Sequence, residues 1–424
     1  MPIPRPIVQW LIAVASLLVA VTTSVSAARG SEDLDQRSLS RIHNPPLGLP
    51  PVPFPATNSP TIPKIRLGRK LFLDRWLSHN GTLSCAMCHV PEQGFTVNEI
   101  QTAVGNQGKT LRRNAPTLLN VAYAAPFFHD GREPELDLQP FDVFLNPDEM
   151  AAPSLGALVD KVRSLPDYAP LFEEAFQEPP TVRHIGQAIG TYLRTLLSAN
   201  SLFDRWYFEE EETLNDAAQR GFSLFTGKAS CVMCHTISHD HTLFADQRFH
   251  DTGLGWFNSI GKPTATEPVA VQLAPGVKAS LERSMVESVG EAPANDLGRY
   301  EVTRDPADRW LFKTPTLRNV AVTAPYMHDG SFSTLREVVE FYNRGAHRHD
   351  GLDPLLGVLG LDKREVGEVV AFLESLTGDN IEELVLDARS ERIGNPGDTD
   401  SPADLALESV PAASPLRRNE KSKN

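Results

Sequence analysis

The chain has 424 residues, of which 41% are hydrophobic and 22% are charged, so it is long enough for two domains with a large buried core. Its formal net charge at pH 7 is −14, which argues against a nucleic-acid partner because phosphates repel an acidic surface. An acidic surface is most often simply solvated, so the charge alone identifies no other partner.

The first residues have the pattern of a secretory signal peptide. Arg5 precedes an apolar run over residues 10–21, and small residues ending at Ala27 form a cleavage pattern. We therefore expect residues 1–27 to be a cleavable signal peptide. The alternative is an uncleaved membrane anchor, although the apolar run is short for a membrane span.

Polar segments flank the central part of the chain. Residues 28–61 form a Pro-rich linker or arm with few backbone donors, and we expect this segment to be extended. Residues 388–424 are charged and rich in Ser, Pro and Asp, which predicts a disordered tail. Neither end is expected to carry chemistry.

The pattern between these segments is mainly helical. Apolar residues recur at spacings of three and four while strand-like alternation is scarce, so the predicted fold class is mostly α with little strand. Helices are expected over residues 65–73, 155–163, 182–197, 217–225, 335–342 and 363–376. Residues 256–295 are rich in Gly, Pro and Ala and predict a surface insertion.

Two copies of a C-x-x-C-H motif use all four cysteines of the chain. In this motif two thiols add to the vinyl groups of a haem and the His takes an axial position on iron. A redox dithiol or a zinc site would leave the His in both copies unexplained. The sequence predicts two covalently bound haem c groups, held by Cys85, Cys88, His89, Cys231, Cys234 and His235. This attachment takes place outside the bacterial cytoplasm, so a periplasmic location is expected.

A second repeat has a constant offset of 199 residues. Residues 115–122 recur as residues 314–321, and the His-Asp-Gly that begins at His129 recurs at His328. Two unrelated loops would not keep this register, so we interpret the repeat as an internal duplication. The predicted haem domains cover residues 62–205 (haem 1) and 206–387 (haem 2).

The repeat distinguishes the two haem sites. Tyr342 in the second half corresponds to Val143 in the first. A tyrosine phenolate can ligate ferric haem iron, whereas valine cannot. If both residues lie over their haems, the iron of haem 2 is six-coordinate and that of haem 1 is open to peroxide. The alternative for Tyr342 is a buried aromatic on an amphipathic helix.

Two polar residues near Val143 suit peroxide chemistry. Cleavage of the O–O bond needs a proton to move from one oxygen to the other, which a carboxylate such as Glu149 can provide while Gln139 orients the peroxide. Taken alone, a glutamate in this sequence context is more often a residue at a helix start than a catalytic base.

Together these residues resemble the bacterial dihaem cytochrome c peroxidase superfamily, including the tryptophylquinone-maturing MauG enzymes. The resemblance covers about residues 62–378 and rests on Leu67–Phe72, Leu83–His89, Arg113–Thr117, Phe312–Val320 and Ala324–Gly330. It implies two cytochrome c-like domains, with peroxide reacting at haem 1 and with Gln139 and Glu149 as the family's distal pair.

The resemblance also implies a calcium ion between the haems. By motif position, its protein ligands are the side chain of Asn114 and the carbonyls of Thr323 and Pro325. Water completes the shell, as suits a hard cation.

Three departures from the ordinary peroxidases are informative. Tyr342 stands at the Met position on haem 2, and residues 90–114 contain no His that could block haem 1. Both features resemble the MauG branch and favour Tyr342 as a ligand. His129 stands where the family usually has a Trp between the haems, so tunnelling or another aromatic relay is the expected path. Val143 replaces a usual Pro.

We therefore expect a periplasmic oxidoreductase of the MauG-like branch that uses hydrogen peroxide at haem 1, with haem 2 as electron relay or store. One alternative is a cytochrome c peroxidase whose donor is a small basic cytochrome or cupredoxin, which the acidic charge would suit. The other is a non-catalytic dihaem electron carrier. The sequence identifies neither the redox-protein donor nor a protein substrate, and it leaves open whether the chain forms a homodimer.

Overall fold

The computed structural model describes residues 32–261, 269–274, 277–281 and 295–391, all of which belong to one structural unit. The described residues are mostly helical, as the sequence predicts. The predicted signal peptide and most of the predicted tail lie outside the described residues.

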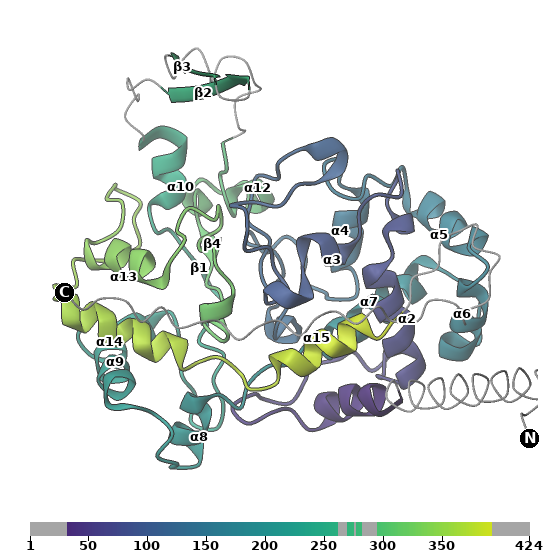
Figure 1. Cartoon of the computed structure of the whole chain (residues 1–424), viewed down its shortest axis with the longest axis horizontal. Helices are drawn as coiled ribbons and strands as arrows, with labels where there is room; N and C mark the ends of the chain where they lie inside the picture. Colours follow the sequence, from purple (N-terminus) through teal and green to yellow (C-terminus); the bar gives the residue numbers. More distant parts are fainter. Residues whose placement is uncertain (1–31, 262–268, 275–276, 282–294, 392–424) are drawn as a thin grey trace, which may run out of the picture. The chain divides into compact units, whose positions relative to one another are not determined.

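The helices form two groups along the chain (Figure 1). The first group is α2 (Ile62–Leu73), α3 (Cys85–Cys88), α4 (Gln139–Leu145), α5 (Leu155–Ser164), α6 (Tyr168–Phe176) and α7 (Val182–Leu193). The second group is α8 (Leu202–Phe208), α9 (Asp216–Thr226), α10 (Leu254–Trp256), α12 (Tyr300–Thr303), α13 (Leu335–Asn343), α14 (Lys363–Glu374) and α15 (Ile381–Arg389).

Short turns and strands connect the helices. The 3₁₀ turns are η1 (Arg75–Leu77), η2 (Pro91–Gln93), η3 (Asn106–Gly108), η4 (Val121–Tyr123), η5 (Cys231–Met233), η7 (Pro306–Asp308) and η8 (Val320–Val322), and η6 (Phe257–Gly261) is π-helical. The strands are β1 (Phe249–His250), β2 (Val269–Ala274), β3 (Val277–Leu281) and β4 (Phe312–Lys313). β1 pairs antiparallel with β4, His250 opposite Phe312, and β2 pairs antiparallel with β3.

The longer helices begin at residues that satisfy their free N–H groups. Thr61 and Thr181 accept hydrogen bonds from the first turns of α2 and α7. Thr334 and Asp362 form capping boxes at the starts of α13 and α14. These caps fix where four of the core helices begin.

A glycine allows the helix before each motif to cross a later helix closely. Gly68 of α2 lies against the carbonyl of Ala188 in α7, and Gly221 of α9 lies against the carbonyl of Glu368 in α14. At both positions a Cβ would overlap the facing backbone. Larger residues would push these helix pairs apart.

The core consists of two main hydrophobic clusters. The first gathers buried residues of α2, α5 and α7, and the second those of α9, α13 and α14. The chain passes from the first cluster to the second near residue 200, because Ala199 belongs to the first cluster and Phe203 to the second. α15 is an exception to this division along the chain. It follows the helices of the second cluster in sequence, but its Leu384 and Ala388 pack in the first cluster.

The predicted helices are present, and their ends agree with the prediction within one residue except at three places. α2 begins at Ile62 rather than at residue 65. α7 ends at Leu193 rather than at residue 197, and α14 ends at Glu374 rather than at residue 376. The apolar pattern continues past α7 because Leu196, Leu197 and Ala199 are buried in a non-helical turn. Burial thus extends further than the helix does.

The prediction of an extended arm over residues 28–61 is wrong for part of this range, because residues 32–43 are helical. The buried face of this helix carries Asp35, Ser38 and Ile42. Two of these three side chains are polar, so the hydrophobic periodicity that normally indicates a helix is weak. The hairpin of β2 and β3, inside the predicted insertion, was also not expected.

The two segments with the offset of 199 share their backbone geometry. Asn120 and Asn319 are both left-handed with φ of 62°, and Phe128 and Met327 have φ of 69° and 73°. An antiparallel bridge of the same spacing closes each His-Asp-Gly turn. The repeat in sequence is therefore also a repeat in local conformation.

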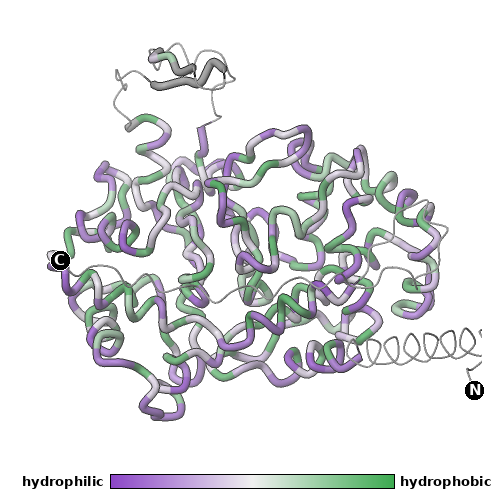
Figure 2. The backbone as a smooth tube through the Cα atoms, in the orientation of Figure 1, coloured by the Kyte–Doolittle hydropathy of each residue, from purple (hydrophilic) through white to green (hydrophobic). Residues whose placement is uncertain are grey.

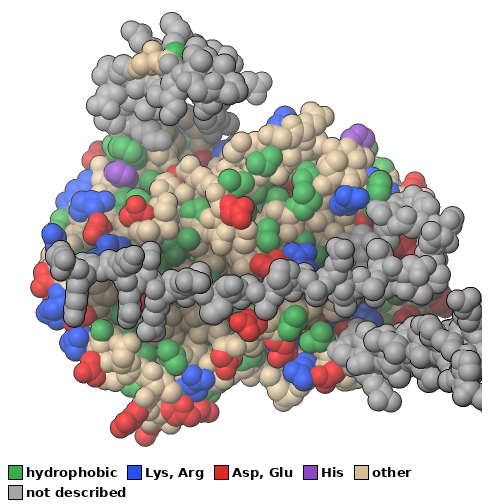
Figure 3. Space-filling model, viewed as in Figure 1, with side chains coloured by type: hydrophobic (Ala, Val, Ile, Leu, Met, Phe, Trp, Pro, Cys, Tyr) green, Lys and Arg blue, Asp and Glu red, His purple; other side chains and the backbone are tan. Residues whose placement is uncertain are grey.

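The surface of the described residues is mixed in character. Figure 2 shows hydrophobic and hydrophilic residues interleaved along the helices, and Figure 3 shows acidic and basic side chains interspersed on the face in view. Among the described residues, none of the helices has the length and apolar character needed to cross a membrane.

Candidate dihaem site

The first C-x-x-C-H motif forms a single helical turn that presents its histidine to a cavity. Cys85 and Cys88 begin and end α3, and the N–H of His89 donates to the carbonyl of Cys85 at 2.9 Å. The Nδ1 atom of His89 lies 3.2 Å from the carbonyl oxygen of Phe95. Since a carbonyl only accepts, Nδ1 carries the proton, and Nε2 keeps the lone pair that an axial ligand needs.

The second motif repeats this arrangement. Cys231 begins η5, and the N–H of His235 donates to its carbonyl at 2.9 Å. The Nδ1 atom of His235 lies 2.8 Å from the carbonyl oxygen of Phe244. Phe95 and Phe244 both have a left-handed backbone, with φ of 55° and 50°, which turns each carbonyl toward its histidine.

Burial keeps the imidazoles of His89 and His235 neutral. Burial lowers the pKa of His89 to about 4 and also lowers the pKa of His235. A neutral imidazole is the form that binds iron. The four cysteines are free thiols, so each pair is available for thioether bonds.

The two motifs line one cavity of about 1650 Å³. Its walls carry the paired thiols, a neutral imidazole at each motif and many apolar side chains. This donor set, repeated in the same geometry, fits one covalently bound haem at each motif.

The residues expected to face peroxide lie together in the first half of the cavity. Gln139 and Val143 lie on α4, and Glu149 follows in the next turn, with its N–H donating to the carbonyl of Asn146 at 3.1 Å. Glu149 acts electrostatically on Cys88, whose pKa is raised to about 11 by burial and then by this carboxylate. The structure therefore brings Gln139, Val143 and Glu149 to the first motif.

Glu149 has the electrostatics of a proton carrier. Burial raises its pKa to about 7, although the charge of Arg132 and a hydrogen bond from Asn146 oppose the shift. A carboxyl group with a pKa near 7 can both accept and return a proton at neutral pH. The sequence alone does not show this shift in the pKa of Glu149, because the shift is caused by burial in the folded protein.

Arg132 is a residue of this pocket that the sequence reasoning missed. Its guanidinium lies over the ring of Phe128 at 3.4 Å and contacts the carboxylates of Asp130 and Asp142 at 3.1 Å each. Arg132 follows the first His-Asp-Gly directly, whereas Ser331 follows the second, so this difference between the repeats was the available signal.

Tyr342 lies on α13 in the second half of the cavity. Burial, followed by the charges of Cys234 and Cys231, raises its pKa well above the usual range. Its hydroxyl makes no hydrogen bond to any described residue, whereas the hydroxyl of Tyr326 donates to the carbonyl of Val320 at 3.0 Å. Tyr342 therefore presents an unpartnered oxygen to the space beside the second motif.

The three residues expected to hold calcium line the same cavity. The Nδ2 atom of Asn114 donates to the carbonyl of Gln101 at 3.0 Å, which leaves Oδ1 free to bind a cation. The carbonyls of Thr323 and Pro325 accept no hydrogen bond from the described residues. Hard oxygen atoms without donors are the groups that suit calcium.

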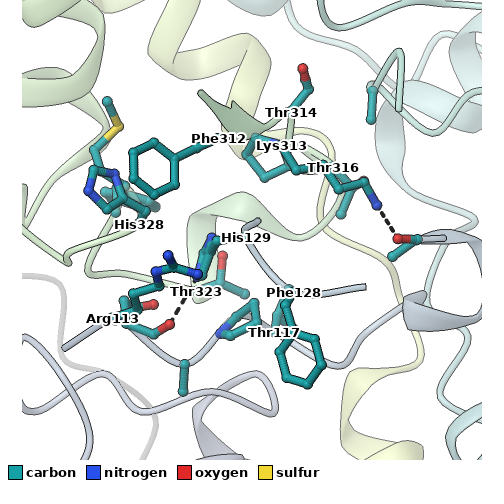
Figure 4. A pocket seen from close by; sticks show the side chains of 18 of the residues that line it. Arg113, Thr117, Phe128, His129, Phe312, Lys313, Thr314, Thr316, Thr323 and His328 are labelled. Carbon is teal, nitrogen blue, oxygen red and sulfur yellow. Dashed lines mark hydrogen bonds between the residues drawn. The ribbon is translucent and has the colours of Figure 1, made fainter. Parts of the chain in front are cut away.

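His129 lies between the two halves and contacts Asn114. Its Nε2 atom lies 3.0 Å from the carbonyl oxygen of Asn114, and burial lowers its pKa to about 4. Figure 4 shows His129 close to the stacked rings of Phe312 and His328, whose centroids are 3.6 Å apart. An aromatic relay between the haems stays a prediction, and these two rings are candidates for it beside His129.

Lys313 is a second residue that the sequence reasoning missed. Its backbone N–H donates to the carbonyl of His129 at 2.9 Å, and its Nζ atom donates to the carbonyl of Ala124 (Figure 4). Burial lowers its pKa to about 8. It directly precedes the repeated segment of residues 314–321, but the sequence gives no sign that its ammonium group is buried.

The fold and this site define a dihaem c-type oxidoreductase. The family described as di-haem cytochrome c peroxidase matches residues 63–212. The chain is 34% identical to methylamine utilization protein MauG of Methylorubrum extorquens, over 89% of this chain and 96% of that protein. It is 32% identical to cytochrome c551 peroxidase of Nitrosomonas europaea, over 77% of this chain and 84% of that protein.

A solved structure supports the same assignment. A MauG-like protein associated with microbial copper homeostasis superposes with a TM-score of 0.65 at 30% identity, covering 80% of this chain and 96% of that one. The chain belongs to the di-haem cytochrome c peroxidase and MauG family. It is a peroxidase that carries haem c, and hydrogen peroxide and redox-protein donors are the reactants of this family.

Proposed function

We propose that this protein is a periplasmic peroxidase of the MauG-like branch, in which peroxide reacts at haem 1 and haem 2 relays or stores an electron. The observation that carries the proposal is the contrast between Val143 and Tyr342 at matching positions of the two repeats. A haem at each motif would supply a redox-active iron, and the first would also supply a free position for peroxide.

Val143 and its neighbours prepare the first site. The valine side chain offers no ligand atom, so a haem held by His89 would keep a coordination position free for peroxide. Glu149 takes a proton from one peroxide oxygen and returns it to the other, for which a pKa of about 7 is suited. The Gln139 side chain, which makes no hydrogen bond to the described residues, is free to orient the peroxide.

Arg132 controls the charge around Glu149. Its guanidinium is held by Asp130 and Asp142, and its positive charge favours the ionised form of Glu149. Without this charge burial would raise the pKa of Glu149 further. Arg132 thus keeps part of the Glu149 population able to accept a proton at neutral pH.

Tyr342 closes the second site. Its unpartnered hydroxyl lies beside Cys231 and Cys234, so we infer that the phenolate would help His235 to hold the iron of a haem at the second motif. Bonding to ferric iron would offset the burial that now disfavours the ionised phenol. The second site then has no free position for peroxide.

The matching geometry of the repeats supports two haem domains related by duplication, with calcium bound by Asn114, Thr323 and Pro325 between them. The pattern of residues 1–27, together with thioether attachment of haem, supports a periplasmic location. The oxidised partner is a redox-protein donor or a residue of a protein substrate.

The test is to add hydrogen peroxide to the oxidised holoprotein and to follow its absorption spectrum. We expect a rapid spectral change that decays when a reductant is supplied. An unchanged spectrum, with no turnover of any reductant, would contradict the proposal. Steady-state oxidation of a small redox protein would place the chain with the ordinary cytochrome c peroxidases instead.

A further inference from the structure

His250 has a carboxylate on each of its two ring nitrogens. The residue lies on β1, where its Nδ1 atom is 2.6 Å from Oδ2 of Asp353 and its Nε2 atom is 2.9 Å from Oδ2 of Asp246. An ionised carboxylate only accepts hydrogen bonds, so both nitrogens must carry a proton. The geometry therefore makes His250 an imidazolium cation.

The backbone around His250 holds this arrangement in place. β1 pairs with β4, which puts His250 opposite Phe312. Oδ1 of Asp353 accepts from the N–H of Leu355 at 2.8 Å, and Oδ1 of Asp246 accepts from the N–H of Arg248 at 2.9 Å. Each carboxylate is thus fixed independently of the imidazole. All three charged side chains are at most 16% exposed.

This cation lies at the second haem motif. The Sγ atom of Cys234, a carboxylate oxygen of Asp246 and a ring nitrogen of His250 lie within 4.8 Å of one another, and His250 lines the cavity. While Cys234 is a free thiol, this thiol, followed by the carboxylates of Asp353 and Asp246, raises the pKa of His250 against the effect of burial. Once the haem is attached, the two carboxylates alone hold the second proton on the ring.

The same three groups have the composition of a metal site, but haem attachment removes that possibility. Cys234 becomes a thioether when the haem binds, and a thioether has no thiolate charge to offer a divalent cation. Both nitrogens of His250 are already engaged by carboxylates. What remains at the haem edge is a fixed positive charge held between two negative ones.

We propose that His250 is a permanent cation at the edge of haem 2 and that it raises the reduction potential of this haem. Reduction adds one electron to ferric iron and moves no proton here, so a nearby positive charge favours the reduced form. The inference rests on the proposed attachment of haem 2 at Cys231 and Cys234. The electron comes from the redox-protein donor of the proposed function.

The positive charge of His250 would offset the effect of a phenolate ligand on the reduction potential of haem 2. An anionic oxygen from Tyr342 stabilises ferric iron and so lowers the potential. An imidazolium in this largely buried position, where its field is weakly screened, acts in the opposite sense. His250 would thereby keep haem 2 within reach of its electron donor.

The test is a spectroelectrochemical titration of the full-length holoprotein and of variants with opposite expected signs. His250→Phe removes the cation, so the ratio of oxidised to reduced haem 2 at a given potential should rise about tenfold, which is about 59 mV for one electron. Asp246→Asn and Asp353→Asn each remove a negative charge and should shift the potential upward. His347→Phe is the matched control, because His347 stacks on Phe257 and does not line the cavity.

Opposite shifts of His250→Phe and the two Asp→Asn variants would support the proposal. Shifts in one common direction, or none beyond that of His347→Phe, would overturn it. If His250→Phe does not fold, His250→Gln replaces it with the same expected downward shift, because glutamine keeps a polar side chain without the positive charge. Electron paramagnetic resonance of the same samples reports the haem 2 ligands separately. A spectrum that excludes Tyr342 as a ligand would contradict the proposed function, whereas the test of His250 would still be valid.

Discussion

Val143 and Tyr342 occupy matching places on α4 and α13, 199 residues apart, and both line the cavity that the two haem motifs share. One side chain is an inert hydrocarbon and the other presents an unpartnered oxygen. The attachment chemistry of the two motifs is the same, so the difference in reactivity between the sites must come from residues beyond them.

The first prediction concerns Tyr342. Tyr342→Phe removes the only oxygen that we expect to ligate haem 2, so the electron paramagnetic resonance signal of this haem should change from low-spin to high-spin. Tyr342→Met should restore a low-spin signal and raise the potential, as a thioether ligand does. Tyr326→Phe is the control, because the hydroxyl of Tyr326 already donates to Val320. An unchanged spectrum for Tyr342→Phe would show that Tyr342 is only a buried aromatic.

The second prediction concerns the proton carried by Glu149. Glu149→Gln should lower peroxide turnover by about a hundredfold or more, because a positioned proton carrier contributes about 10²–10⁴-fold. The absorption spectrum of the oxidised protein should stay the same. Glu135→Gln is a suitable comparison, since Glu135 lies in the same segment without lining the cavity. Equal activity of the two variants would remove Glu149 from the mechanism.

The third prediction is a pH dependence with a defined sign. The pKa of Glu149 is raised from 4.5 to about 7, and only the ionised form can accept a proton from peroxide. Turnover should therefore fall as the pH drops below about 7, and Glu149→Gln should not show this step.

The contribution of Glu149 to the stability of the fold changes with pH in the opposite sense. Between about pH 4.5 and 7 the folded state binds more protons than the unfolded state, so this group's contribution to stability falls as the pH rises.

Calcium removal provides the fourth prediction. Chelation should lower peroxide turnover while the haems stay attached through their thioether bonds, and added calcium should restore activity. Asn114→Ala should weaken this rescue because it removes the side-chain oxygen expected to bind the ion. Asn80→Ala is the control, since Asn80 bonds Asn106 and does not line the cavity. Full activity in the presence of chelator would exclude a required ion.

The fifth prediction concerns a buried ion-pair network. Arg69 of α2 is 1% exposed, and its Nη2 atom lies 2.8 Å from carboxylates of both Asp35 and Asp387. Arg69→Met removes the cation that is paired with the buried carboxylate of Asp387 and leaves Asp35 with Arg66, so it should destabilise the fold by about 3–5 kcal/mol in urea unfolding. Arg37→Met, which breaks an exposed pair with Asp33, should leave the midpoint near that of the unmodified protein. Similar midpoints for the two variants would contradict this role.

Much of the site was predictable because its chemistry is local in sequence. The C-x-x-C-H motifs place two thiols and a histidine on one turn, and the constant offset aligns Val143 with Tyr342. The helices flanking the motifs were predictable from their apolar spacing.

The remaining features depend on contacts between distant segments. The helix at residues 32–43 was missed because its buried face carries Asp35 and Ser38, whose partner groups lie on α2 and α15. The pairing of His250 joins residues 103 positions apart, and the burial that raises the pKa of Glu149 arises only when the cavity closes. Polar residues of this kind give no periodic signal, so only the fold shows what they contact.

The most direct test of the central claim is the electron paramagnetic resonance spectrum of the fully oxidised holoprotein. We predict one high-spin haem, whose iron faces Val143, and one low-spin haem without methionine ligation, whose iron faces Tyr342. Two low-spin haems would contradict the claim, because the first site would then have no free position for peroxide.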